Sequence, residues 1–346
     1  RIDFQGNTKG ALLLEPSRSN IFDYSSNLSA WNKLNSTVTE SSVLSLDGVN
    51  NSYVYERTSS SSSYIYRTVS LSNTTVYTLS FFAKSGTSTN VRTDIWDTVQ
   101  STQCSIQVDL KTKAISNFNG TSYKIEDYTN GWMRISVTFT SESSFGATFN
   151  RYFNADSVGS QLYIWGAQVE EGSYATSYIP TSGSAVTRVA DVCNNGANEQ
   201  VINSTEGVLY AEIKALNETG GNRYISLSDG TDSNRILLRF QDTDKVGCFV
   251  RDASGSFAEI TKTSASISSN FLKVAVKWKT NDVALWVNGV EIGVDSSFTT
   301  FNANVLNRLN LTGATTTTSQ YFYGNVKDLK VYNTALTDQE LAALTS

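Results

Sequence analysis

The stretch VYTLSFFAK, residues Val76–Lys84, decides the fold class because its apolar and polar side chains alternate. Tyr77, Leu79 and Phe81 fall on one side of an extended chain, since successive side chains of a β-strand point to opposite faces. The same alternation recurs in two later stretches, with the apolar faces Met133, Ile135, Val137 and Phe139, and Cys104, Ile106, Val108 and Leu110. Strands with one apolar face are typical of antiparallel sheets. The sequence therefore predicts an all-β protein.

The domain organisation follows from length and from a break in this pattern. The chain has 346 residues, which is long for one domain and suits two. Residues 181–204 show little apolar periodicity, and strands resume at Gly207. We expect two antiparallel β-sandwich (jelly-roll) domains, residues 1–190 and 191–346. Thr337 and Glu340 form a capping box that predicts one short C-terminal helix, from about Asp338 to Leu344.

Composition excludes several classes of function. The chain contains no histidine, which removes Ser-His-Asp and Cys-His nucleophiles, His-containing zinc sites and imidazole acid–base catalysis. The net charge is −5 without any run of Lys or Arg, so no nucleic-acid partner is expected. The longest apolar stretches, such as residues 11–14, are too short to insert into a membrane.

Four stretches in the first half carry a family resemblance: residues 10–20 (GALLLEPSRSN), 131–140 (GWMRISVTFT), 162–172 (LYIWGAQVEEG) and 177–181 (SYIPT). They resemble a jelly-roll module that recurs in tail and fibre proteins of bacterial viruses. That module is similar to the carbohydrate-binding modules of polysaccharide-degrading enzymes. The resemblance implies an extracellular location on a virion surface or tail appendage, and a homo-oligomer, such as a trimer, formed through the parent fibre.

The C-terminal third carries a second resemblance, in residues 273–278 (KVAVKW), 283–289 (VALWVNG) and 324–340. These stretches look like the laminin-G or concanavalin-A-like fold. Such domains usually bind glycans or proteins, sometimes through calcium. The two resemblances together imply a polysaccharide partner, but a fold alone does not fix a ligand.

A first candidate site for sugar lies on the strand around residues 91–98. Alternation places Arg92, Asp94 and Trp96 on one face of this strand. A flat aromatic ring beside charged and polar groups is what carbohydrate binding needs, and Tyr64 and Tyr66 on an earlier strand are placed to extend the site. The alternative is that Trp96 caps the sandwich core and the two charges are ordinary surface.

A second candidate site combines five residues of the C-terminal domain. Alternation turns Arg239, Phe249, Arg251, Lys277 and Trp286 away from the apolar faces of their strands. If those strands are neighbours, one open sheet face carries three cations and two aromatic rings, which suits an anionic polysaccharide. The alternative is a polar cover over a solvated sheet.

Acidic residues give only weak signals of a metal or a catalyst. Asp229–Asp232 and Asp242–Asp244 offer oxygens to Ca²⁺, but they also fit hairpin turns and lack the spacing of a dedicated loop. We therefore expect no cofactor, with Ca²⁺ as the open alternative. Glycoside hydrolysis needs two carboxylates flanking one bond, and Glu170/Glu171 and Asp94/Asp97 are the only tempting pairs. Adjacent strand residues such as Glu170 and Glu171 point to opposite faces.

These observations favour a non-catalytic carbohydrate-binding and adhesion segment of a phage-like virion protein. Binding would rest on aromatic stacking and hydrogen bonds at rigid sheet faces. Two alternatives stay open. One is a structural or protein-interacting spacer, and the other, less favoured, is a polysaccharide lyase or hydrolase working with Tyr, Lys and carboxylates.

Overall fold

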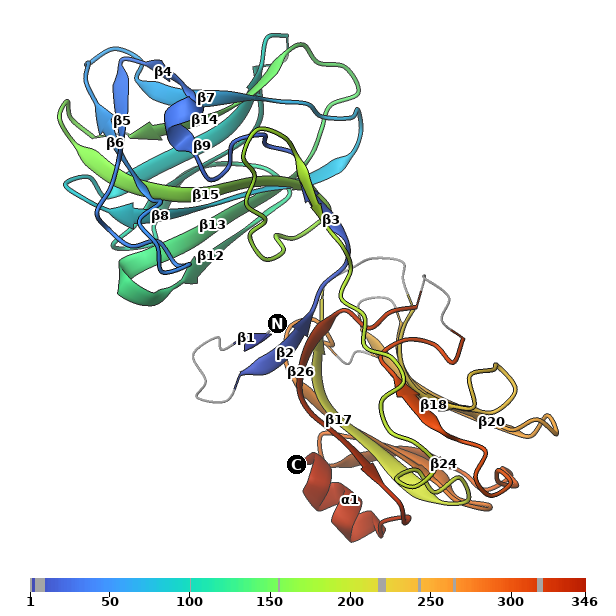
Figure 1. The fold of residues 1–346 in the computed structure, drawn as a ribbon. Helices are drawn as coiled ribbons and strands as arrows, with labels where there is room; N and C mark the ends of the chain where they lie inside the picture. Colours follow the sequence, from blue (N-terminus) through green and yellow to red (C-terminus); the bar gives the residue numbers. More distant parts are fainter. Residues whose placement is uncertain are drawn as a thin grey trace. The chain divides into compact units, whose positions relative to one another are not determined.

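The computed structural model describes residues 2–3, 10–99, 101–154, 156–216, 222–241, 244–263, 266–315 and 320–346. Antiparallel strands dominate it, and its only α-helix among these residues is short and C-terminal, so the predicted all-β class is confirmed (Figure 1). The chain forms two compact units. One unit is Ser17–Val189 and is called the inserted unit below. The other combines Arg1–Pro16 with Ala190–Ser346 and is called the split unit.

The inserted unit is a sandwich of two six-stranded antiparallel sheets. The first sheet has the order β11 (Ile115–Asn119), β10 (Ser101–Asp109), β9 (Asn90–Asp97), β14 (Thr148–Asn154), β7 (Tyr64–Val69) and β4 (Asn32–Leu34). The second has the order β12 (Ser122–Asp127), β13 (Trp132–Thr140), β8 (Val76–Ser85), β15 (Gln161–Glu171), β6 (Tyr53–Arg57) and β5 (Ser36–Glu40). Two 3₁₀ turns, Leu28–Ala30 and Thr129–Gly131, and the short pair β3 (Arg18–Asn20) and β16 (Val186–Arg188) complete it.

The core of the inserted unit lies between these two sheets. Tyr77, Leu79 and Phe81 are buried in it, as the alternation of VYTLSFFAK predicted. The ring of Phe81 on β8 lies 4.8 Å from that of Tyr152 on β14, measured between centroids, so the two sheets are in direct contact. The other two predicted apolar faces, on β13 and around β10, also lie in this core.

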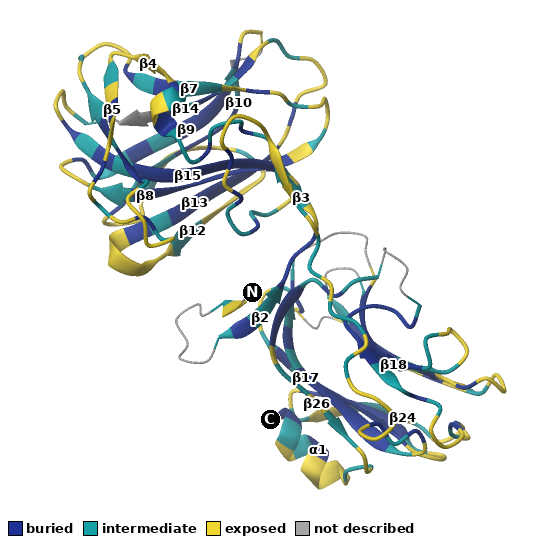
Figure 2. Cartoon of the chain, in the orientation of Figure 1, coloured by how far each residue is buried: buried dark blue, intermediate teal, exposed yellow. Residues whose placement is uncertain are grey.

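The outer face of the second sheet is covered by the chain that follows β15. Thr176 donates its amide to Glu170 at 2.8 Å, and Arg134 donates to the Thr176 carbonyl at 2.6 Å. Phe82, on the outer side of β8, is buried there against Trp165. Figure 2 accordingly shows β8, β13 and β15 mostly in the colour of buried residues. On the outer face of the first sheet, by contrast, the aromatic and arginine side chains of β7, β9 and β14 are only partly buried.

The split unit is a second sandwich. Its larger sheet has the order β1 (Ile2–Asp3), β2 (Ala11–Leu14), β26 (Gly324–Tyr332), β17 (Gly207–Ala215), β22 (Leu272–Trp278), β23 (Val283–Val287) and β24 (Val290–Asp295). Its smaller sheet has the order β21 (Phe257–Lys262), β20 (Lys245–Arg251), β19 (Arg235–Gln241), β18 (Arg223–Ser228) and β25 (Arg308–Asn310). Among the described residues, buried apolar side chains of both sheets form one core in this unit.

The predicted C-terminal helix is present as α1 (Asp338–Thr345). The Thr337 side chain accepts from the amide of Glu340, and the Glu340 side chain accepts from the amide of Thr337, which confirms the capping box. Leu341 packs with Trp286 on the outer side of the seven-stranded sheet, so α1 covers part of that face. No helix among the described residues has the length and apolar character needed to cross a membrane.

The N-terminal segment departs from the expected domain boundary. Sequence periodicity placed residues 1–190 in the first domain, whereas Arg1–Pro16 groups with the C-terminal residues. Leu12 on β2 pairs with Val326 on β26, and Leu14 is buried in the core of the split unit. The correction has a physical reason. Alternation along a strand shows which side chains face a core, but it carries no information on which sheet the strand joins.

Candidate functional site

The five residues predicted for the first site lie together on the outer face of the first sheet of the inserted unit. We call this surface the Trp96 face. It consists of Tyr64 and Tyr66 on β7, Arg92, Asp94 and Trp96 on β9, and Phe149 and Arg151 on β14. Strand β14 lies between β7 and β9, so Arg151 is directly opposite Asp94 on one side and Tyr66 on the other. The pairing of distant strands therefore assembles the face.

Trp96 belongs to the surface and not to the core. Its neighbour Ile95 is fully buried between the sheets, whereas Trp96 points the other way and is half-exposed. The alternative in which Trp96 caps the core therefore does not describe this strand. The charges beside it are also organised rather than scattered, as the contacts of Asp94 show.

Aromatic rings form a row across three neighbouring strands of the face. The rings of Trp96 and Phe149 are stacked, with centroids 6.1 Å apart and planes 26° apart. Phe149 meets Tyr66 edge to face at 5.7 Å, and Tyr66 meets Tyr64 at 5.8 Å. Aromatic pairs at these separations stabilise one another beyond the area they bury. The row is therefore a preformed, semi-rigid apolar strip.

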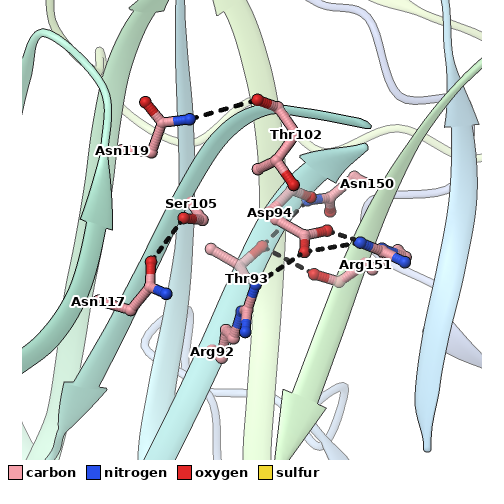
Figure 3. Close-up of polar contacts among 9 residues, drawn as sticks. All are labelled: Arg92, Thr93, Asp94, Thr102, Ser105, Asn117, Asn119, Asn150 and Arg151. Carbon is pink, nitrogen blue, oxygen red and sulfur yellow. Dashed lines mark hydrogen bonds and ion pairs between the residues drawn. The ribbon is translucent and has the colours of Figure 1, made fainter. Parts of the chain in front are cut away.

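A buried carboxylate holds the centre of the face. Asp94 is fully buried, and both of its oxygens accept from Arg151, from Nε at 2.8 Å and from Nη2 at 2.9 Å (Figure 3). Arg92 adds a third cationic contact, with Nη2 3.6 Å from Oδ2. Burial raises the pKa of the Asp94 carboxyl, and the guanidinium groups of Arg151 and Arg92 offset part of that rise. Asp94 thus acts as an anchor for the two arginines.

The anchored Arg151 guanidinium sits between two rings of the row. Its Cζ lies 5.0 Å from the centroid of Trp96 and 5.3 Å from that of Tyr64. Cation–π contacts of this kind favour a fixed orientation of the guanidinium. Because only 17% of the side chain is exposed, the charge is presented on the face without a mobile stem.

Amides and hydroxyls extend the face on its β10 and β11 side. Ser105 donates to Asn117 at 2.8 Å, and Asn119 donates to the Thr102 carbonyl at 3.2 Å (Figure 3). Ser105 is also the strand partner of Asp94, so this polar margin adjoins the charged centre directly. Side-chain amides offer both donors and acceptors, which sugar hydroxyls require.

Phe149 and Arg151 were missed at the level of sequence. They alternate with the buried Asn150 and Tyr152 in the stretch TFNRYFN, residues 148–154, so a local signal for a strand was present. That alternation would have placed both residues on one outward face. It would not have shown that β14 lies between β7 and β9.

The second predicted site is divided between two sheets. Arg239, Phe249 and Arg251 lie on the outer face of the five-stranded sheet, on β19 and β20. Lys277 and Trp286 lie on β22 and β23 of the seven-stranded sheet. These strands are therefore not all neighbours, and the prediction of one open face that carries all five residues is wrong. Outward alternation is common to both sheets of a sandwich, so it cannot assign a strand to one of them.

Lys277 and Trp286 are moreover covered. The Lys277 ammonium lies 2.9 Å from Asp282 and 3.1 Å from Asp338. Burial lowers the pKa of Lys277, but the hydrogen bonds and charges of these two carboxylates outweigh it, and the net shift is upward. Trp286 is 6% exposed and packs beneath α1. Neither side chain is open to a polymeric ligand in this structure.

The candidate calcium residues behave as turn residues where they are described. Asp229 accepts from the amide of Thr231 at 2.8 Å and from the Asn234 side chain at 2.8 Å, as in a tight hairpin turn. Asp232 pairs with Arg235. Asp242 lies outside the described residues. Within the described part of the chain, no group of three or more His, Cys, Asp or Glu side chains is placed to hold a metal.

The candidate carboxylate pairs for hydrolysis do not face one another. Glu170 is fully buried and accepts from Thr176 at 2.8 and 2.6 Å, whereas Glu171 is exposed. Asp97 accepts from the amide of Val99 at 2.7 Å and from Gln103 at 2.8 Å. Glu170, Asp97 and Asp94 are thus occupied by hydrogen bonds within the fold.

Residues 195–342 match the family model of the Concanavalin A-like lectin/glucanases superfamily. This stretch is most of the split unit, so the predicted resemblance of the C-terminal third to that fold is confirmed. The resemblance of the first half to a viral tail module stays a prediction. A search of curated proteins gave no match.

The chain has some likeness to solved structures, three of which follow. A Ruminococcus gnavus IT-sialidase CBM40 bound to alpha2,3 sialyllactose is 22% identical, with a TM-score of 0.36 over 41% of this chain and 83% of its own. A SAP-like pentraxin from Limulus polyphemus is 13% identical, with a TM-score of 0.36 over 44% and 74%. Domains LG4-5 of the mouse laminin alpha1 chain are 10% identical, with a TM-score of 0.29 over 93% and 90%. At these identities and TM-scores, the likenesses do not bear on function.

Proposed function

We propose that the chain is a non-catalytic carbohydrate-binding segment and that the Trp96 face holds the glycan. The observation that carries the proposal is the row of half-exposed rings beside arginines anchored on a buried carboxylate. A strip of this kind, bordered by amides and hydroxyls, supports recognition of a saccharide.

The dimensions of the row favour an oligosaccharide over a single sugar. From β9 across β14 to β7 the row spans two strand spacings, about 10 Å, before the width of the rings is added. The C–H faces of the sugar rings would lie on Trp96, Phe149 and Tyr66. Arg151 and Arg92 would donate to hydroxyl or ring oxygens, and Asn117 and Asn119 would complete the polar margin.

The chemistry of the face supports binding rather than turnover. A general base needs a carboxylate that is free to take a proton from its substrate. Both oxygens of Asp94 are held by Arg151, and Glu170 and Asp97 are engaged in the hydrogen bonds described above. The proposal therefore assigns no catalytic residue.

A wider role goes with this site. We propose that the segment acts in adhesion outside the cell, on the surface or tail of a phage-like virion. The resemblance of residues 10–20, 162–172 and 177–181 to viral tail modules supports this context. Several copies of a weak site in a symmetric fibre, such as a trimer, would raise the overall affinity through multivalency.

Glycan-array binding by the full chain and by Trp96→Ala tests the site. We expect Trp96→Ala to abolish most of the wild-type signal, because it removes the ring that begins the row. Tyr123→Ala is the matched control, since Tyr123 is an aromatic residue of the same unit that is 50% exposed but lies on β12 of the other sheet. Equal retention by Trp96→Ala and wild type would refute the site. Retention of no glycan by wild type would favour the spacer function.

Release of reducing ends or of unsaturated sugars from a panel of polysaccharides tests for an enzyme. We expect none from the purified chain. Measurable turnover would contradict the non-catalytic proposal.

A further inference from the structure

The outer face of the five-stranded sheet in the split unit is hollowed. A polar hollow of about 390 Å³ opens on this face. Its lining includes Asp232, Arg235, Leu237, Arg239 and Phe249. The lining residues come from β18, β19 and β20, from Asp232 in the turn between β18 and β19, and from described residues before β26, so the floor of the hollow is a sheet.

Two arginines flank one aromatic ring in this hollow. Arg235 and Arg239 lie two residues on either side of Leu237, and Leu237 is directly opposite Phe249 on β20. Their Cζ atoms are 5.2 and 5.3 Å from the centroid of the Phe249 ring. The Nε atoms of both arginines are buried and have no hydrogen-bond partner among the described residues. The sheet thus fixes two guanidinium groups around a single ring.

The carboxylates that pair with these two arginines are much more exposed than the arginines themselves. Arg235 pairs with Asp232, and Arg239 pairs with Glu259. The two carboxylate side chains are 61% and 48% exposed, whereas the arginine side chains are 19% and 10% exposed. The carboxylate partners are thus open to solvent, so a ligand anion can reach the two guanidinium groups and compete with these carboxylates. Arg251, exposed on the same face, forms no ion pair with any residue that the structure describes.

A second hollow adjoins the first across the Phe249 ring. It measures about 300 Å³ and is lined by Phe249, Arg251, Gly255 and Phe257. The Phe257 ring is stacked against Phe249, with centroids 6.0 Å apart and planes 22° apart, and the residue is 58% exposed. An exposed ring in this position is a platform for the apolar face of a sugar. The two hollows therefore offer an anion position beside a stacking position.

We infer that this face is a second saccharide site, specific for a carboxylate-bearing polysaccharide. The acid group enters the first hollow between Arg235 and Arg239, where the planar guanidinium groups match a carboxylate. The neighbouring sugar stacks on Phe257, with Arg251 beside it. The inference rests on the proposed function only in that the ligand is again a saccharide. It uses none of the residues of the Trp96 face.

Binding of polygalacturonate to the full chain tests the inference, with highly methyl-esterified polygalacturonate as the neutral counterpart of the same backbone. We expect the acidic polymer to bind and the esterified one to bind at least tenfold more weakly. Arg239→Gln should weaken binding of the acidic polymer about tenfold, the scale of one lost charge-assisted hydrogen bond. Phe257→Ala should weaken it as well, and Lys279→Gln, an exposed lysine elsewhere in the unit, should leave it unchanged.

One further variant and one further probe complete the test. Arg251→Gln alters an exposed side chain and cannot disturb the core, so it should show a loss of affinity even if Arg239→Gln folds poorly. Polyglutamate is the probe for attraction to charge without a sugar, and we expect it to bind far more weakly than polygalacturonate.

The outcomes separate this site from the Trp96 face. Loss of polygalacturonate binding in Arg251→Gln but not in Trp96→Ala supports the second site. Loss in Trp96→Ala but not in Arg239→Gln and Arg251→Gln overturns it and leaves the Trp96 face as the site. If the methyl-esterified polymer binds as tightly as polygalacturonate, the carboxylate is not recognised. If polyglutamate binds as tightly, the sugar is not recognised. Either result overturns the inference.

Discussion

Leu14→Ala provides a test of the split unit, because Leu14 lies far in sequence from the core it enters. Leu14 is 5% exposed and belongs to the same core cluster as Val326 and Leu209. Truncation of a buried leucine to alanine costs about 2–5 kcal/mol, depending on how far the cavity collapses. Strand β2 is short and is followed outward only by β1, so its surroundings can relax. We therefore expect a loss near the low end, about 2–3 kcal/mol.

The expected loss falls on one unit only. For a domain of this size, each kcal/mol shifts Tm by about 2–4 °C, so the split unit should melt about 4–12 °C lower. The inserted unit should keep its Tm, because distant sites without shared partners behave additively. Differential scanning calorimetry of the full chain measures both transitions. Amide hydrogen exchange then assigns them, with protection lost in β26 and β17 but retained in β8 and β13.

Ile2→Ala is the control for this experiment. Ile2 belongs to the same N-terminal segment, but it is 57% exposed, and we expect its truncation to change Tm by less than the uncertainty of the measurement. A fall in protection within β8 or β13 for Leu14→Ala, with β26 unaffected, would refute the assignment of residues 1–16 to the split unit.

Two further predictions concern charges of the inserted unit. Arg151→Leu leaves the buried Asp94 carboxylate with only Arg92 nearby, so it should lower the free energy of unfolding, measured by urea titration, by about 3–5 kcal/mol. The double variant Asp94→Asn with Arg151→Leu should recover part of this loss. No recovery would contradict the role of Asp94 as an anchor for Arg151. Hydrogen bonds from the Thr112 amide and the Thr89 hydroxyl lower the pKa of Asp109 from 3.8 to about 2, so this group stabilises the fold above its unfolded pKa and the stabilisation is lost as pH falls through about 2. The unfolding free energy, measured from pH 5 to pH 2, should therefore fall with pH, and less steeply in Asp109→Asn; identical slopes would exclude the contribution of Asp109.

Local alternation predicted much of the fold and five of the seven residues of the Trp96 face. The direction of Tyr77, Leu79 and Phe81, and of Arg92, Asp94 and Trp96, depends only on the two-residue repeat of a strand, and both are as predicted. The capping box of α1 is equally local. Each of these features depends on fewer than ten consecutive residues, so the sequence alone is sufficient to predict it.

Strand partners could not be predicted in the same way. Arg151 meets Asp94 because β14 lies beside β9, and their positions are 57 residues apart in the sequence. Lys277 and Trp286 alternate outward just as Arg239 does, yet they lie on the other sheet beneath α1. Pairing at such separations is decided by the packing of the whole sandwich, and no short stretch encodes it.

The return of β26 to β2 has a consequence for the order in which the protein forms during translation. Asn325 donates to Asp3 across a separation of 322 residues, so β2 emerges from the ribosome long before its partner exists. The whole of Ser17–Val189 is synthesised in between and can close its own core first. A nascent chain that is released before residue 324 would thus carry a finished inserted unit preceded by a β2 whose β26 edge is open, a species suited to chaperone capture.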